Sequence, residues 1–114
     1  MNIHPLNNAK TEWRLTLDDD IDMDTYHRLE QEVVDRLCQT LFEAEAKKLI
    51  VDLTTTKRIS SLGLQLLLSM YKKCNGQEIQ MILLNPSGQI RRILQILQFD
   101  RIFTIEYTGD KTDH

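Results

Sequence analysis

The chain has 114 residues, of which 41% are hydrophobic and 27% are charged, a composition typical of one globular domain that packs helices on a sheet without cross-links. Its net charge of −3 argues against a protein whose main partner is nucleic acid, because binding to a phosphate backbone requires a positive field. The sequence shows no signal-peptide pattern and no apolar run long enough to span a membrane, which indicates a cytoplasmic protein.

Hydrophobic periodicity predicts the elements of the first half of the chain. We expect residues 1–10 to form a short N-terminal strand or arm, and the alternation of apolar and polar side chains from Glu12 to Leu17 predicts a strand with one buried face. A strand is also predicted at Leu49–Leu53. Between these two strands, apolar residues recur at three- and four-residue steps and predict an amphipathic helix from about Asp24 to Phe42: Tyr26, Leu29, Val33, Leu37 and Leu41.

The second half of the chain repeats this alternation. A helix is predicted over Ser61–Asn75, a strand over Ile79–Leu84, a third helix after Asn85 and a final strand over Ile102–Tyr107. Residues 108–114 are expected to be a flexible polar tail. Strands that alternate with helices predict an α/β domain with a largely parallel sheet and right-handed crossovers.

The predicted helix from Ser61 has apolar residues on two faces. One stripe is expected to cover the sheet: Leu64, Leu67, Leu68, Tyr71 and Cys74. Leu62 and Leu66 fall nearly opposite this stripe, so we expect them to be exposed and to form a docking patch. The alternative is that another helix or a loop covers both leucines, or that they are isolated surface residues.

Two hydroxyl residues, Ser60 and Ser61, stand at the start of the same helix, after Lys57 and Arg58. Either serine suits an N-cap, because its oxygen can accept a hydrogen bond from a free backbone N–H group. A phosphate there would also be tolerated by the helix dipole, and its charge beside Leu62 would oppose docking. Capping and phosphorylation are therefore both open at this position.

Two stretches of the chain match motifs of one known family. Residues 49–68, with the sequence LIVDLTTTKRISSLGLQLLL, resemble the central strand, loop and helix start of STAS domains, the fold of bacterial anti-sigma factor antagonists. Asp20–Thr25 is similar to the G-E-L-D-x-x-T motif of that family, with Asp22 on its aspartate, although Asp19 replaces its glycine.

Two further stretches follow in the order that the family shows. Asn85-Pro86 followed by Ile90–Leu94 is similar to N-P-x-V-x-R-x-L, and Phe99–Phe103 is similar to the G-L-x-x-x-F entry to the last strand. The resemblance covers about Trp13 to Ile105. It implies a single STAS-like domain over residues 1–114, with a four- to five-stranded mixed sheet and about three helices packed mainly on one face.

The resemblance also implies a function. In the family, the unphosphorylated domain binds an anti-sigma factor that is a serine kinase of the GHKL type, which frees a sigma factor. The kinase phosphorylates a serine in an Asp-Ser-Ser/Thr-Gly-Leu motif, and a phosphatase of the PPM type removes the phosphate. Counting back from Gly63 places the acceptor on Ser61, with Ser60 as the second choice. Ser60 replaces the aspartate of the motif, and Leu62 replaces its second hydroxyl residue.

The implied protein is not an enzyme, needs no cofactor or metal, binds no nucleic acid directly and is a monomer or weak dimer. The partner-binding residues that we expect cluster around the acceptor: Asp22, Asp24, Lys57, Arg58, Ser60, Leu62, Gly63 and Leu66.

Other interpretations of these residues are weaker. A hydrolase with Ser61 as nucleophile would need a G-x-S-x-G elbow, but Ile59 stands at the position of its first glycine. The alternating aspartates of residues 18–24 lack the glycine and final glutamate of a calcium loop, so a solvated acidic turn is expected there. The main alternative is a STAS accessory or scaffold subunit, in a transport ATPase complex or a stressosome-like assembly, without a phosphorylation cycle.

Overall fold

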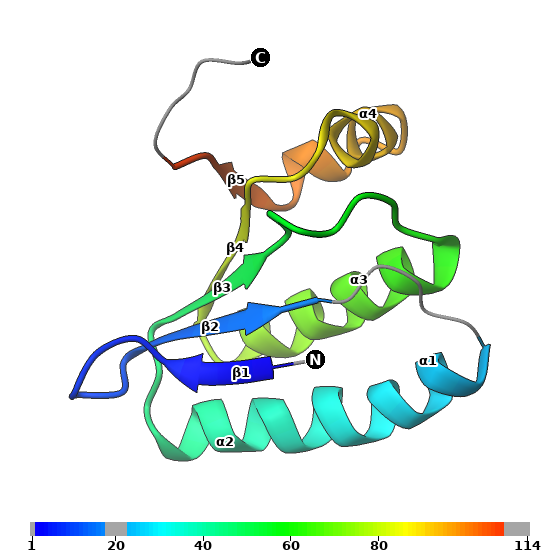
Figure 1. Cartoon of the computed structure of the whole chain (residues 1–114). Helices are drawn as coiled ribbons and strands as arrows, with labels where there is room; N and C mark the ends of the chain where they lie inside the picture. The colour runs from blue at the N-terminus through cyan, green and yellow to red at the C-terminus, as the bar shows by residue number, and fades with distance from the viewer. Residues whose placement is uncertain (1, 18–22, 109–114) are drawn as a thin grey trace.

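Five strands form one sheet in the order β1-β2-β3-β4-β5 in a computed structural model that describes residues 2–17 and 23–108 (Figure 1). The strands are β1 (Asn2–Pro5), β2 (Glu12–Thr16), β3 (Lys48–Asp52), β4 (Gln80–Leu84) and β5 (Thr104–Glu106). β1 is antiparallel to β2, and all later neighbours are parallel. The predicted mixed α/β sheet is confirmed.

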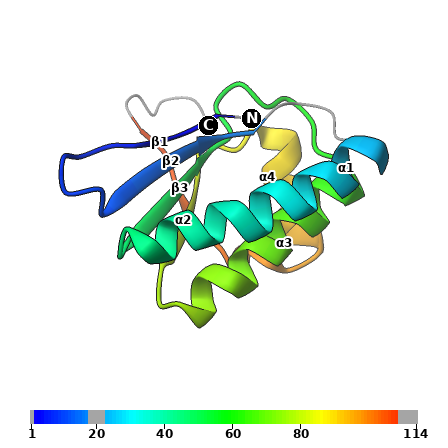
Figure 2. The ribbon, with the colours of Figure 1, turned by 90° about the horizontal axis from the view of Figure 1, so that it is seen from below.

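Helices connect the successive parallel strands. The first connection is a helical run of α1 (Met23–Leu29), a π-helical segment η1 (Glu30–Leu37) and α2 (Cys38–Glu43), and the others are α3 (Ser61–Gly76) and α4 (Gly88–Ile96), with a 3₁₀ turn η2 (Phe99–Arg101) before β5. Because neighbouring strands are also consecutive in sequence, right-handed crossovers return every helix to the same face of the sheet. Figure 2 shows the first helical run and α3 side by side beneath that face. Within the described stretches, no helix has the length and apolar character needed to cross a lipid bilayer.

The core lies between this face of the sheet and the helices. Trp13 and Leu15 of β2 are buried while their neighbours in the strand are only half-buried, which confirms the alternation expected from the sequence. Buried residues of β3, β4, α3 and α4 complete one apolar cluster: Leu49, Val51, Met81, Leu83, Leu66, Leu67, Met70, Ile90 and Leu94. The cluster fixes the position of α3 against the ends of the strands.

The prediction that Leu66 is exposed is wrong. Leu66 is fully buried (0% exposed), and Leu62 is half-buried against the core. The reason is that α3 packs against β4 on one side and against the α1, η1 and α2 segments on another, so its second apolar face is covered as well. Of the stripe expected to face the sheet, Leu64, Leu67 and Cys74 are buried, whereas Leu68 and Tyr71 are half-buried.

Replacing Leu66 tests this correction. Leu66→Ala should lower the free energy of unfolding by about 2–5 kcal/mol, because it leaves a cavity in the core. The adjacent Gln65 is exposed, so Gln65→Ala should change stability by no more than about 0.5 kcal/mol. Urea unfolding followed by circular dichroism measures both variants, and equal stabilities would contradict the buried position of Leu66.

Candidate functional site at the start of helix α3

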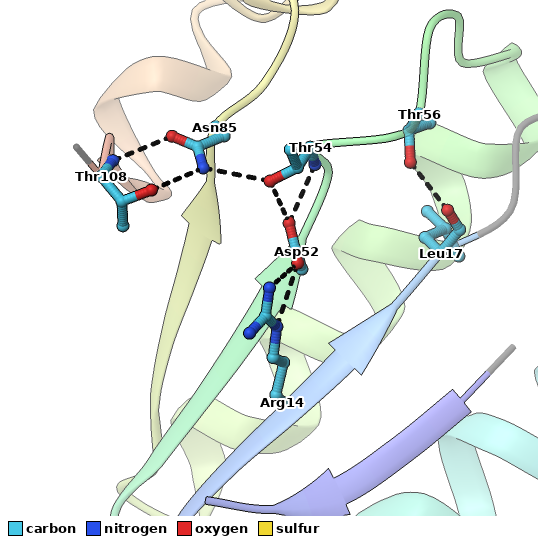
Figure 3. A network of polar contacts seen from close by, with 7 residues as sticks. All are labelled: Arg14, Leu17, Asp52, Thr54, Thr56, Asn85 and Thr108. Carbon is cyan, nitrogen blue, oxygen red and sulfur yellow. Dashed lines mark hydrogen bonds and ion pairs between the residues drawn. The ribbon is translucent and has the colours of Figure 1, made fainter. Parts of the chain in front are cut away.

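Two buried side chains, those of Thr56 and Ile59, anchor the loop between β3 and α3. The Thr56 hydroxyl is buried (1% exposed) and donates a hydrogen bond of 2.7 Å to the carbonyl oxygen of Leu17, the residue after β2 (Figure 3). Ile59 lies in the apolar core directly before the helix. The start of α3 is therefore held in a fixed place above the carboxyl ends of the strands.

The two candidate serines have different roles at this start. Ser60 is the N-cap: its backbone is extended (φ −86°, ψ 171°), and its Oγ accepts a hydrogen bond of 3.2 Å from the N–H group of Gly63. Ser61 is the first residue of α3 and is exposed. Its hydroxyl group forms no hydrogen bond with any residue that the structure describes. Among the described residues, the capping hydrogen bond is made by the Ser60 hydroxyl and not by that of Ser61.

A polar network at the end of β3 supports the beginning of the loop. One carboxylate oxygen of Asp52 accepts hydrogen bonds from Nε (3.0 Å) and a terminal nitrogen of Arg14, on β2. The other oxygen accepts from the backbone N–H of Thr54 (2.9 Å) and from the Thr54 hydroxyl. Figure 3 shows that Asp52 in this way joins two strands and the loop.

Asn85, the residue after β4, extends the network. Its side-chain nitrogen donates to the hydroxyl oxygens of Thr54 and Thr108, both at 3.0 Å, and its side-chain oxygen accepts from the Thr108 N–H at 2.9 Å. Its backbone is left-handed (φ 54°), a conformation that asparagine adopts more readily than most residues. The network thus connects the middle of β2, through Arg14, with the carboxyl ends of β3, β4 and β5.

The pKa of Asp52 reflects this network. Burial by itself would raise the pKa, but the hydrogen bonds from Thr54 and Arg14 outweigh burial and hold the pKa below its ordinary value. Asp52 is therefore ionised at neutral pH, and both of its oxygens are already occupied. This arrangement suits a residue that positions the loop rather than one that abstracts a proton from a substrate.

A second connection joins the loop to α4. Ser87 is the N-cap of α4, and its hydroxyl also donates a 3.1 Å hydrogen bond to the carbonyl oxygen of Lys57. Beside this contact lies an open groove with a volume of about 330 Å³, lined by Arg58, Ile59, Gln89, Arg92 and Ile93. The groove adjoins the start of α3 and brings together residues from two separate segments.

The structure places most of the predicted site residues in one region. Lys57 and Arg58 are exposed in the loop, and Ser60 is the exposed N-cap of α3. In the first turn of α3, Leu62 is half-buried and Gly63 is buried. Asp24 is exposed in the first turn of α1, a helix that contacts α3. Asp22 and most of the acidic turn lie outside the described residues. Leu66 belongs to the core and not to this surface.

Sequence reasoning missed the polar network and the contribution of α4. The relevant signal was that polar residues end two adjacent parallel strands, Asp52 on β3 and Asn85 after β4, so their side chains meet at one edge of the sheet. Within the described residues, no three histidine, cysteine, aspartate or glutamate side chains form a cluster that could hold a metal ion.

Comparison with known proteins identifies the family. Residues 12–111 match the family model of the STAS domain, so the chain belongs to the STAS domain family. A search of curated protein sequences found no match.

Solved structures share the fold. TM1081 from Thermotoga maritima, assigned as an anti-sigma factor antagonist, matches with a TM-score of 0.78 and 17% identity over 95% of this chain and 86% of its own. The anti-sigma factor antagonist SpoIIAA in its unphosphorylated form matches with a TM-score of 0.73 and 16% identity, covering 95% of this chain and 88% of its own. An anti-sigma factor antagonist from Mycobacterium paratuberculosis matches with a TM-score of 0.67 and 22% identity, covering 96% of this chain and 89% of its own. At these identities the likeness shows the fold.

The Asp52 network makes stability depend on pH. Asp52→Asn should lower the free energy of unfolding at pH 7 by about 1–3 kcal/mol, because hydrogen bonds to a charged group are lost. A carboxyl whose folded pKa is depressed stabilises the fold above its unfolded pKa, about 3.9, and this contribution disappears as the pH falls through the folded pKa. The difference between wild type and variant should therefore shrink below about pH 4.

Urea unfolding at pH 7 and at pH 3 measures this effect. Asp35 forms an exposed ion pair with Lys73 (3.2 Å), so Asp35→Asn is the matched control and should change stability by less than about 1 kcal/mol. A wild-type advantage over Asp52→Asn that stays constant between the two pH values would contradict the role of the Asp52 carboxylate.

Proposed function

We propose that this protein is an anti-sigma factor antagonist that is controlled by phosphorylation of Ser61. The observation that carries the proposal is the position of Ser61, whose exposed hydroxyl stands at the first residue of α3 while Ser60 performs the capping. Membership of the STAS family and the likeness to three anti-sigma factor antagonists support this kind of protein.

In its unphosphorylated form the protein binds an anti-sigma factor that is a serine kinase of the GHKL type, and a sigma factor is released. The binding surface consists of the loop and first turn of α3, with Lys57, Arg58, Ser60 and Leu62. Asp24 is included as a residue of the first turn of α1, which contacts α3, and Asp22 is included because it matches the aspartate of the family motif. Leu66 and Gly63 are removed from this surface because both are buried.

Phosphorylation ends binding by local electrostatics. The Ser61 oxygen attacks the γ-phosphorus of ATP held by the kinase, ADP leaves, and a base of the kinase takes the hydroxyl proton. The phosphate then lies at a helix N-terminus, where the free N–H groups and the helix dipole favour a negative charge, so the fold is retained. Nearly two added charges beside the half-buried Leu62 oppose a partner that must desolvate this surface. A phosphatase of the PPM type hydrolyses the ester and restores the first state.

The chain supplies no catalysis of its own in this cycle, which takes place in the cytoplasm, and it acts as a monomer or weak dimer. It offers only a hydroxyl that another enzyme modifies and a surface that the added phosphate changes.

A second candidate is a STAS accessory or scaffold subunit without a phosphorylation cycle, as in a transport ATPase complex or a stressosome-like assembly. The observation that favours it is Ser60 in place of the aspartate of the family motif. Serine and aspartate cap helices about equally well, so the substitution keeps the cap that the structure shows but removes a negative charge next to the acceptor. A kinase that recognises this charge would act poorly on Ser61.

Mutation of Ser61 separates the two candidates. Incubation with the cognate kinase and ATP should add about 80 Da to the wild type, mapped to Ser61, and nothing to Ser61→Ala. Ser61→Asp should bind the kinase at least about tenfold more weakly, or about 1.4 kcal/mol, in isothermal titration calorimetry. Binding of Ser61→Asp with wild-type affinity, or no mass shift in the wild type, would favour the accessory subunit.

The neighbouring hydroxyl provides the control. Ser60→Ala removes the cap and should lower the free energy of unfolding by about 1 kcal/mol, because the N–H group of Gly63 loses its partner. The variant should still accept one phosphate on Ser61. Transfer of the phosphate to Ser60 in the wild type would reverse the assignment of the two serines.

A further inference from the structure

Helix α4 has an outward face that the core covers only in part, at the half-buried Ile93. Its buried residues are Ile90 and Leu94, whereas Ile96 is 71% exposed, the largest exposed fraction of any large hydrophobic residue in the described part of the chain. One face of α4 carries four residues that are spaced three or four positions apart: Gln89, Arg92, Ile93 and Ile96. Leu97, 47% exposed, continues the apolar surface beyond the helix.

One wall of the groove described above is formed by Gln89, Arg92 and Ile93 of this face. The opposite wall is the loop before α3, with Arg58 and Ile59, and the hydrogen bond between Ser87 and the Lys57 carbonyl holds the two walls together. We call the whole feature the α4 groove and define it by Arg58, Ile59, Gln89, Arg92 and Ile93. Its apolar residues are Ile59 and Ile93, and the exposed Ile96 lies about one turn further along the same face of α4.

The charge of the α4 groove is opposite to that of the chain. The chain carries a net charge of −3, yet the residues lining the groove include two arginines and no acidic side chain. Both arginines are exposed, and neither pairs with a carboxylate within residues 2–17 and 23–108. Planar guanidinium groups at the edges of an apolar floor are suited to bind carboxylates in a bidentate way.

We propose that the α4 groove binds an acidic amphipathic helix of a partner protein. The apolar side chains of that helix, at spacings of three and four residues, would pack on Ile59, Ile93 and Ile96, while its flanking carboxylates pair with Arg58 and Arg92. This deepens the proposed function and rests on it in one respect: the helix belongs to the anti-sigma factor, which contacts the start of α3 and the adjacent groove together.

An anionic membrane surface has similar chemistry but fits the observations less well. The feature is a concave groove between two segments rather than a flat face. A single helix with carboxylates at both edges matches the shape and the two separated arginines.

Binding of a model peptide tests the groove without the natural partner. The probe is an 18-residue helical peptide with leucines at spacings of three and four, flanked by glutamates, added to the ¹⁵N-labelled full chain. The backbone amide signals of Arg58, Arg92 and Ile96 should shift, and a peptide with lysine in place of each glutamate should cause no such shift. Shifts located on the uncovered face of the sheet, or equal shifts with both peptides, would overturn the proposal.

Charge reversal gives the matched test. The double variant Arg58→Glu, Arg92→Glu should weaken binding of the acidic peptide at least about tenfold. The control Arg36→Glu, Lys72→Glu changes the net charge equally at exposed positions away from the groove, and its affinity should stay within about threefold. Equal loss in both variants would show a nonspecific charge effect. Vesicles that contain anionic lipid should not bind. If they bind through the same two arginines, the groove binds a membrane surface and not a helix of a partner protein.

The inference and the proposed function can fail separately. If the cognate kinase binds the wild type and the arginine double variant equally well, the groove is not part of the interface although the protein remains an antagonist. If the acidic peptide binds the groove but the kinase does not bind the wild type, the groove is a binding site and the proposed function is wrong.

Discussion

A carboxylate that is almost fully removed from water stays charged only when its oxygens accept hydrogen bonds, and Asp52, 6% exposed, meets this condition with groups from two directions. Arg14 reaches it from β2, and Thr54 reaches it from the loop that leads to α3. Removing Arg14 would leave one oxygen of the buried Asp52 carboxylate without these donors. The direction in which the loop leaves β3, and hence the place where α3 begins, depends on this set of contacts.

The network explains how the site combines rigidity with a modifiable group. Asp52, Thr54 and Asn85 occupy one another's donors and acceptors, Thr56 is bound to the end of β2, and Ser60 caps the helix. The hydroxyl of Ser61 is left exposed on the first turn of a well-anchored helix. A charge added at this point changes the surface that a partner meets while the support beneath it stays in place.

Local patterns predicted the elements well, because period-2 alternation in β2 and helical spacing in α3 follow from burial of one face. They could not say which element covers a second apolar face, so Leu66 was expected on the surface although the first helical run covers it. Contacts between distant residues were equally hidden, such as the hydrogen bond from Asn85 to Thr54. The same limit concealed the α4 groove, whose walls lie about thirty residues apart in sequence.

The central claim is that a partner binds the start of α3 and that a phosphate on Ser61 ends this binding. Hydrogen–deuterium exchange of the chain, alone and with its anti-sigma factor kinase, measures both parts when it is repeated after addition of ATP. The account predicts protection of the backbone amides of residues 57–63 and of α4 in the complex, and loss of this protection as the mass of the Ser61 peptide rises by about 80 Da. Protection confined to β1 and the uncovered face of the sheet, or protection that persists after Ser61 is phosphorylated, would contradict it.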